Sequence, residues 1–317
     1  MRALLSAFVG VLLLFLTTGT ARAEPTVVTT GIYINQIHEL NLKENFFVID
    51  AFVWFRWTGE NIKPTESFSF IDGRIESKVE SGVRQLPGGI TYASYRVVVK
   101  ITKYWDVRQY PLDHHTLTVA FEEDKEDVHD IRYEPDTENS GIGPNVRMPG
   151  FVLTYAGTTA GNAAYHSNFG DTSLPTHNAS EYTRLTTSIG LTREGSTYFA
   201  KLFFALWVAA AIAFLSFFVK PTNVDPRFGL GVGAIFAAIA SEYTVSSGLP
   251  EIGAATLADR LHVVAYAAIF VTLAQSTVSL WLYEKGQEDR SKRTDRQFSF
   301  GLPLVYAVAN ILVIALR

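Results

Sequence analysis

The stretch LFFALWVAAAIAFLSFFV, residues 202–219, contains no charged side chain. Three more uncharged runs follow it, at residues 228–241, 263–283 and 298–316. A helix of about 20 residues crosses the hydrocarbon core of a bilayer, so the first, third and fourth runs are long enough to span it. The second run reaches that length when it is extended through Glu242 to Ser247. The sequence therefore predicts four membrane-spanning helices, at about residues 199–219, 228–247, 261–283 and 298–316.

The second span differs from the other three in its polar and small residues. It includes the carboxylate of Glu242 and the glycines Gly229, Gly231 and Gly233. A charged side chain is costly in lipid and is normally found facing protein or water. We therefore expect one face of this helix to be turned away from the lipid.

The overall composition agrees with a protein that is partly embedded in a membrane. Hydrophobic residues make up 48% of the 317 residues, and charged residues only 18%, compared with about 25% in soluble domains. The net charge of −4 argues against a nucleic-acid-binding surface, which needs basic side chains to offset phosphate charge. The absence of cysteine excludes disulfides, thiolate metal sites and cysteine nucleophiles.

The N-terminus has the pattern of a secretory signal peptide. An apolar run at residues 3–16 follows Met1-Arg2, and the small-residue ending Ala21-Arg22-Ala23 precedes Glu24. We interpret residues 1–23 as a cleaved signal peptide, with an uncleaved anchor as the alternative. The remainder of the N-terminal half is then exported, and the first span runs inward.

The charges of the connecting loops agree with this topology. The intervening outer loop has one basic residue, Arg260. The two loops that would face the cytoplasm have seven: Lys220, Arg227, Lys285, Arg290, Lys292, Arg293 and Arg296. This asymmetry follows the positive-inside rule and places the C-terminus on the same side as the exported domain. The basic loop at residues 285–296 is read as a retention signal, with a lipid-binding or partner site as the alternative.

Residues 24–197 are predicted to form an all-β domain, because hydrophobic residues alternate with a period of two. The segment at residues 45–58 is apolar on both faces, as expected for a strand packed against a second sheet. We therefore predict a β-sandwich. Asp72-Gly73 predicts a hairpin, and the segment at residues 86–89 predicts another turn.

Motifs for catalysis or metal binding are scarce. The histidines show no metal-ligand spacing, and His114-His115 would point to opposite faces of a strand. No nucleophile elbow or phosphate-binding loop is present. The acidic run at residues 122–127 is interpreted as a solvated loop, with a divalent-cation or proton-sensing cluster as the alternative. We expect neither enzymatic activity nor a metal or other cofactor.

The segment at residues 105–117, WDVRQYPLDHHTL, resembles the signature loop of the pentameric ligand-gated ion channels, the Cys-loop receptor superfamily, in its cysteine-less bacterial form. The resemblance extends to the stretch from Thr30 to Trp57 and to Arg193 just before the first span. It implies a periplasmic sandwich followed by a four-helix transmembrane bundle. It also implies a homopentamer in the bacterial inner membrane, with the N-terminal domain and the C-terminus periplasmic.

The resemblance assigns the second span as the pore-lining helix. The residues facing the pore would be Asp225, Gly229, Gly233, Phe236, Ala240, Tyr243 and Ser247. The last six follow one another at steps of 4, 3, 4, 3 and 4, which keeps them on one side of a helix. Phe236 would be a hydrophobic gate that closes by dewetting. The alternative is that the glycines mediate helix packing and Phe236 belongs to the core.

The resemblance also implies a coupling site between the two domains and a ligand site. The coupling residues would be Tyr110, Pro111, Asp113, Arg193, Glu39 and Pro250. The ligand site would be an aromatic cage between subunits, built from Tyr155, Tyr165, Phe169 and Tyr182, whose ring faces can hold a cation. The alternative is that these aromatic residues only anchor their loop.

These features predict a homopentameric, ligand- or proton-gated ion channel, with cation selectivity favoured by the carboxylates of Asp225 and Glu242. Its partners would be identical subunits, membrane lipids, inorganic ions and an unknown small-molecule agonist or protons. The alternative is a non-conducting, membrane-anchored periplasmic sensor or binding protein of the same fold. This alternative function is retained because residues 59–92 have no Trp-x-Pro motif at the expected agonist loop.

Overall fold

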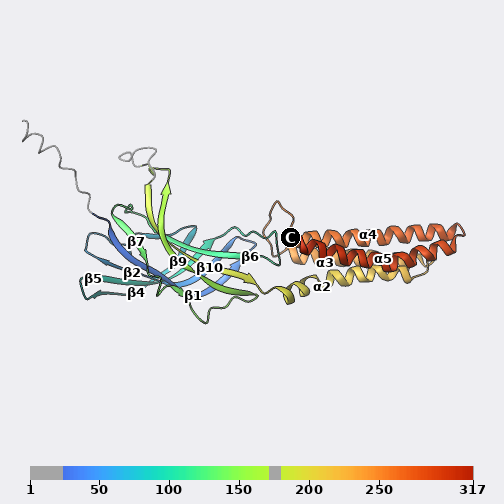
Figure 1. Ribbon diagram of the computed structural model, residues 1–317, viewed down its shortest axis with the longest axis horizontal. Helices are drawn as coiled ribbons and strands as arrows, with labels where there is room; N and C mark the ends of the chain where they lie inside the picture. Colours follow the sequence, from blue (N-terminus) through green and yellow to red (C-terminus); the bar gives the residue numbers. More distant parts are fainter. Residues whose placement is uncertain (1–23, 171–179, 317) are drawn as a thin grey trace, which may run out of the picture.

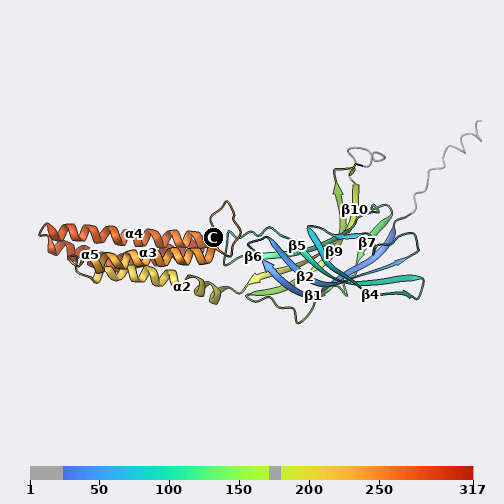
Figure 2. The same ribbon diagram turned by 180° about the vertical axis from the view of Figure 1, so that it is seen from behind.

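The computed structural model describes residues 24–170 and 180–316. The predicted signal peptide, residues 1–23, lies outside the described residues. A β-domain and a helical bundle lie end to end along the long axis of the molecule (Figure 1). The described C-terminal residues lie at the end of the bundle that adjoins the β-domain (Figures 1 and 2). The described end of α5 is therefore near the β-domain.

The β-domain is a sandwich of two sheets, as predicted from the alternating pattern. Its strands are β1 (Thr26–Asn41), β2 (Phe46–Thr58), β3 (Phe68–Phe70), β4 (Gly73–Leu86), β5 (Ile90–Thr102), β6 (His114–Glu123), β7 (Ile131–Pro135), β8 (Gly141–Ile142), β9 (Phe151–Tyr165) and β10 (Ser180–Arg193). One sheet has the order β4, β5, β2, β1, β7, with β8 paired to β1. The other has the order β3, β6, β10, β9.

The hairpin predicted at Asp72-Gly73 is wrong. Asp72 has a φ of 54° and does form a tight turn, but β3 pairs with β6 while β4 pairs with β5. The chain therefore changes sheets at this turn. The Asp-Gly signal specifies a turn conformation with positive φ, but it does not specify which strands pair. The turn at residues 86–89 does connect a hairpin, formed by β4 and β5.

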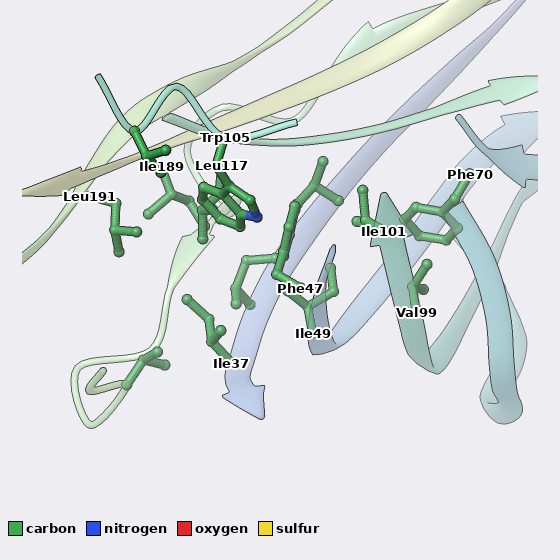
Figure 3. Close-up of a cluster of buried hydrophobic side chains, with 14 of the residues drawn as sticks. Ile37, Phe47, Ile49, Phe70, Val99, Ile101, Trp105, Leu117, Ile189 and Leu191 are labelled. Atoms are coloured by element: carbon green, nitrogen blue, oxygen red, sulfur yellow. The ribbon is translucent and has the colours of Figure 1, made fainter. Parts of the chain in front are cut away.

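Hydrophobic side chains from both sheets fill the interior of the sandwich (Figure 3). Phe47 and Ile49 of β2 meet Val99 of β5, and Leu117 and Ile189 come from the second sheet. Burying one such side chain contributes roughly 1.5–3 kcal/mol. Most residues of β2 are buried, which explains why this strand is apolar on both faces.

The bundle consists of α2 (Gly195–Phe214), which continues into the short helix η2 (Leu215–Phe218), followed by α3 (Val224–Ser246), α4 (Leu257–Glu284) and α5 (Glu288–Ala315). Within the described chain, four helical segments are long and apolar enough to cross a membrane, including the continuous segment Thr197–Phe218. The protein is therefore a multi-pass membrane protein.

The observed helices begin before the predicted spans. α2 begins at Gly195, so the predicted domain boundary at residue 197 falls within its first turn. α5 begins at Glu288, whereas the predicted fourth span begins at residue 298. The first turns of α5 are rich in charged residues. Such residues can form part of a helix that extends into water, but the prediction counted only uncharged residues and therefore left them out.

Candidate functional site

The loop between β5 and β6 connects the sandwich to the helical bundle. The hydroxyl groups of Tyr110 and Tyr198 lie 2.7 Å apart, and Tyr198 is in the first turn of α2. The backbone N–H of Leu257, the first residue of α4, donates to the carbonyl of Arg108 at 2.8 Å. Pro111 follows Tyr110 through a cis peptide bond. One loop of the sandwich thus contacts the starts of two membrane helices.

A buried ion pair lies behind this loop. Arg193 Nε donates to Asp113 Oδ1 at 2.9 Å and Arg193 Nη2 to Oδ2 at 3.3 Å. His115 Nε2 lies 2.5 Å from Asp113 Oδ2. The side chain of Asp113 is 1% exposed and that of Arg193 is 8% exposed. Burial alone would raise the pKa of Asp113, but the hydrogen bonds from His115 and Arg193 outweigh it and lower this pKa to about 2.

Aromatic rings surround the guanidinium group of Arg193. Its central carbon lies 4.4 Å from the ring centre of Phe151, 5.0 Å from that of Tyr110 and 5.3 Å from that of Tyr198. A cation over aromatic faces is stabilised by their quadrupoles. The sequence resemblance brought Tyr110, Asp113 and Arg193 together, and the structure does the same. The partners Phe151, Tyr198 and His115 were missed, although the predicted alternation had placed His115 opposite His114.

Glu39 and Pro250 are not part of this ion-pair cluster. Glu39 lies in β1 and accepts a hydrogen bond from Asn41 Nδ2 at 3.2 Å, and Pro250 is buried. Among the described residues, no hydrogen bond or ion pair joins either of them to Asp113 or Arg193. Their role in coupling remains a prediction from the resemblance.

Two faces of α3 have opposite environments within the protomer. The residues assigned to the pore are all exposed: Asp225, Gly229, Gly233, Phe236, Ala240, Tyr243 and Ser247. The opposite face is buried, through Arg227, Gly231, Ala234, Ala238, Ser241 and Val245. Phe236 and Tyr243 are 66% and 76% exposed. A single protomer thus leaves uncovered the face that carries Gly229, Gly233 and Asp225.

The charged residues of α3 are divided between these faces. Arg227 is 0% exposed and donates to Asp295 of α5 at 2.6 and 2.9 Å, and also to the carbonyl of Val219 at 2.9 Å. Glu242 accepts a hydrogen bond of 2.5 Å from the hydroxyl group of Tyr266 on α4. Asp225, in contrast, is exposed in the first turn of α3.

Three of the four predicted ligand-site aromatics form a cluster near the tip of β9 and β10. The ring centres of Tyr165 and Phe169 are 5.7 Å apart, and Tyr182 lies 6.0 Å from Tyr165 and 6.5 Å from Phe169. Tyr155 is aligned with Ile189, further along β9 toward the membrane, while Tyr165 is aligned with Ser180. The structure therefore separates Tyr155 from the cluster. Residues 171–179, which follow Phe169, lie outside the described residues.

An ionic network supports the aromatic cluster. Arg184 donates to Glu122 Oε2 at 2.8 and 3.0 Å and to the hydroxyl oxygen of Tyr165 at 2.8 Å. Tyr165 donates to Glu122 Oε1 at 2.5 Å. Burial and the hydrogen bond to Glu122 raise the pKa of Tyr165. The acidic run at residues 122–127 therefore contributes at least one carboxylate to the cluster and is not solely a solvated loop.

A second group of aromatic residues lies on the other sheet. A cavity of about 400 Å³ is lined by Tyr33, Phe52, Trp54, Arg56, Tyr92, Asp136 and Asn139. Asp136 accepts hydrogen bonds from Trp54 at 3.0 Å, Arg56 at 2.9 Å and Asn139 at 2.8 Å. The sequence showed aromatic residues in these strands, but not that they face one cavity.

Glu123 is buried next to the ionic network formed by Arg184, Glu122 and Tyr165. Its neighbour Glu122 binds Arg184 on the second sheet, whereas Glu123 is 0% exposed. Glu123 Oε2 and the buried hydroxyl of Tyr133 both lack a hydrogen-bond partner among the described residues. Burial raises the pKa of Glu123, despite hydrogen bonds from Ser67 and from the backbone of residue 125.

Comparison with known proteins finds a bacterial ion channel that is similar to most of this chain. The chain is 22% identical over 314 residues to a proton-gated ion channel of Gloeobacter violaceus. The aligned region covers 92% of this chain and 83% of that channel. No protein-family model matches the chain.

Proposed function

We propose, on the premise that this chain is a relative of the bacterial pentameric ligand-gated ion channels, that five copies form a gated ion channel. The sandwich domains would sense the stimulus, and the five α3 helices would surround the pore. No enzymatic step is needed, because ions would flow passively down their gradient. The proposal rests first on the two-faced α3 helix.

The exposed face of α3 requires a partner that a single protomer does not supply. It carries glycines, Ser247 and Asp225, which are poorly suited to contact lipid tails. A ring of five α3 helices would turn this face toward a central aqueous path. Phe236 would then form the hydrophobic constriction, and Tyr243 would lie about two helical turns further toward the sandwich.

We propose that the channel favours cations. Arg227 is withdrawn from the exposed face by its ion pair with Asp295, whereas Asp225 remains exposed. Five Asp225 carboxylates would ring the cytoplasmic entrance, and such rings attract cations. Replacing Asp225 by Asn should therefore reduce the permeability ratio of K⁺ to Cl⁻ in reconstituted vesicles.

Protons are the stimulus that we propose to test first, because a relative is a proton-gated channel. A small cationic agonist held by Tyr165, Phe169 and Tyr182 is the other candidate, since their rings form one cluster. The resemblance implies that this cluster would lie between subunits. The membrane would be the bacterial inner membrane, with the sandwich on the periplasmic side.

The first experiment is to measure the native mass of the purified complex in mild detergent. Five protomers are expected, and this measurement requires no knowledge of the agonist. A stable monomer or dimer would remove the pore and would favour the alternative, a membrane-anchored sensor or binding protein.

The second experiment tests conduction and the gate together. Vesicles containing the pentamer should release K⁺ when the external pH is lowered or a ligand is added. Phe236→Ala should raise the leak at neutral pH, because a smaller side chain lets water fill the constriction. Phe270→Ala is the matched control, since Phe270 is 69% exposed on α4. An equal leak in both variants would place Phe236 outside the pore.

A further inference from the structure

A cavity of about 630 Å³ lies at the end of the bundle that is remote from the sandwich, between η2, the end of α4 and the start of α5. Its wall includes four aromatic side chains, among them Phe218 and Phe300, and three basic side chains, Lys220, Lys292 and Arg296. These residues belong to segments that are far apart in the sequence. Neither the coupling site nor the pore face uses this cavity.

The cavity lies at the boundary between apolar and charged sequence. Lys220 is the first charged residue after the uncharged run at residues 202–219, and Arg296 is the last one before the uncharged run at 298–316. Phe218 and Phe300 stand on the apolar side of these cations, and each is 71% exposed. In a bilayer this is the depth at which the phosphate groups of phospholipids meet the acyl chains.

The charges around the cavity are not balanced. Lys292 pairs with Glu288 at 3.2 Å, and Asp295 pairs with Arg227 at 2.6 Å. Within the described part of the chain, Lys220 and Arg296 have no ion-pair partner. Two positive charges therefore remain for a ligand. A zwitterionic headgroup also carries a positive group, which Lys220 and Arg296 would repel. An anionic headgroup carries no such group.

We propose that this cavity binds an anionic phospholipid of the cytoplasmic leaflet. The phosphate would lie between Lys220 and Arg296, and an acyl chain would cover Phe218 and Phe300. A free phosphate ion would satisfy the charges but would leave the aromatic side chains uncovered, so the observations favour the lipid. Basic cavities between membrane helices on the cytoplasmic side are suited to such headgroups.

The lipid would lie against the contact that joins α5 to the start of α3. Asp295 lines the cavity and holds Arg227 of α3. Ser279 of α4 also donates to Asp295, at 2.7 Å. A lipid bound beside Arg296 would therefore stabilise the junction of three helices. This inference goes beyond ion conduction and does not depend on it.

The experiment is native mass spectrometry of the purified complex with added lipid. Phosphatidylglycerol and phosphatidylcholine with identical acyl chains are compared. We expect phosphatidylglycerol to bind about thirty-fold more tightly, since each of the two basic side chains contributes about 1 kcal/mol near an anionic lipid and about 1.4 kcal/mol is ten-fold in affinity. The double variant Lys220→Gln/Arg296→Gln should lose this preference, and each single variant should lose part of it.

The matched control is Lys285→Gln/Arg293→Gln, which removes the same two types of charge from exposed positions outside the cavity lining. It should keep the preference for phosphatidylglycerol. An equal loss in the control, or equal binding of the two lipids to the unmodified protein, would overturn the proposal. Release of bound phosphatidylglycerol by millimolar inorganic phosphate would also overturn it, because the site would then be one for the free ion.

A second measurement covers the case in which the double variant folds poorly. Added phosphatidylglycerol should raise the melting temperature of the unmodified protein and of the control, but should raise that of Arg296→Gln by a smaller amount. An identical rise in all three proteins would contradict the proposed site.

Discussion

A carboxylate and arginine pair lies near each end of the strand pair β6 and β10, where Asp113 directly precedes β6, and the two pairs differ in their exposure. At the end remote from the membrane, Arg184 is aligned with Glu122, and their side chains are 29% and 8% exposed. At the membrane end, Arg193 binds Asp113, and their side chains are 8% and 1% exposed. The same chemistry is therefore partly accessible to solvent at one end and enclosed at the other.

The two pairs contact different parts of the molecule, although they lie at the two ends of the same pair of strands. The outer pair is joined to Tyr165 and the aromatic cluster, and its arginine is partly exposed to solvent. The inner pair is enclosed by rings that include Tyr198 of α2, so that it contacts the membrane domain directly. The strands between them are hydrogen-bonded through a continuous register. A displacement at the outer end has a direct structural connection to the start of α2.

The largest effect is expected at the inner pair. Asp113→Ala leaves Arg193 buried without its partner, which should destabilise the protein by about 3–5 kcal/mol. Thermal unfolding of the purified protein in detergent measures this loss. Adding Arg193→Ala to the first change should recover part of the stability, because it removes the uncompensated charge.

The inner pair also predicts an acid dependence. The pKa of Asp113 is lowered from 3.8 to about 2, so its contribution to stability is present above pH 3.8 and is lost as the pH falls toward 2. The melting temperature of the unmodified protein should decrease over that range more steeply than that of the double variant. Parallel decreases would show that the pair contributes little.

An intermediate effect of opposite sign is expected at Glu123. Burial raises the pKa of Glu123 above 4.5, so the folded state binds this proton more tightly than the unfolded state. The associated stability is present at low pH and is lost as the pH rises through the folded-state pKa. Glu123→Gln removes the buried charge and should raise the melting temperature at pH 8 by roughly 2–8 °C.

The difference between Glu123→Gln and the unmodified protein should vanish near pH 4, where Glu123 is protonated. Glu134→Gln is the control, because Glu134 is exposed on β7 beside Tyr133. If the channel opens with protons through this region, Glu123→Gln should also flatten the response of K⁺ release to pH. A Glu123→Gln protein with the same melting temperature as the unmodified one at pH 8 would exclude a buried charge there.

The smallest effect on stability is expected at the outer pair. Arg184 is partly exposed, so Arg184→Gln should cost less than about 1 kcal/mol. It should nevertheless change the response to the stimulus, because Tyr165 and Glu122 lose a shared donor. Thermal unfolding and K⁺ release, measured on the same preparation, separate the two effects. A loss of stability as large as that of Asp113→Ala would remove the contrast between the two ends.

Much of the architecture could be predicted from local sequence. The uncharged runs identified the four helices, because a backbone in lipid must satisfy its own hydrogen bonds within a helix. Alternation identified the sandwich and placed His115 on the face opposite to His114. The spacing of four and three residues placed the residues that the resemblance assigned to the pore on one side of α3, and these residues are exposed in the protomer. Each of these features depends on a period or a length that the sequence displays directly.

Features that join distant segments were decided only by the tertiary structure. The turn at Asp72-Gly73 was predictable, but the different partners of β3 and β4 were not. Arg227 and Asp295 are separated by 68 residues, and Tyr110 and Tyr198 by 88. No periodicity relates such positions, because their contact depends on how whole strands and helices pack. For the same reason, the buried state of Arg227 and the cavity beside Arg296 became visible only after the helices were assembled.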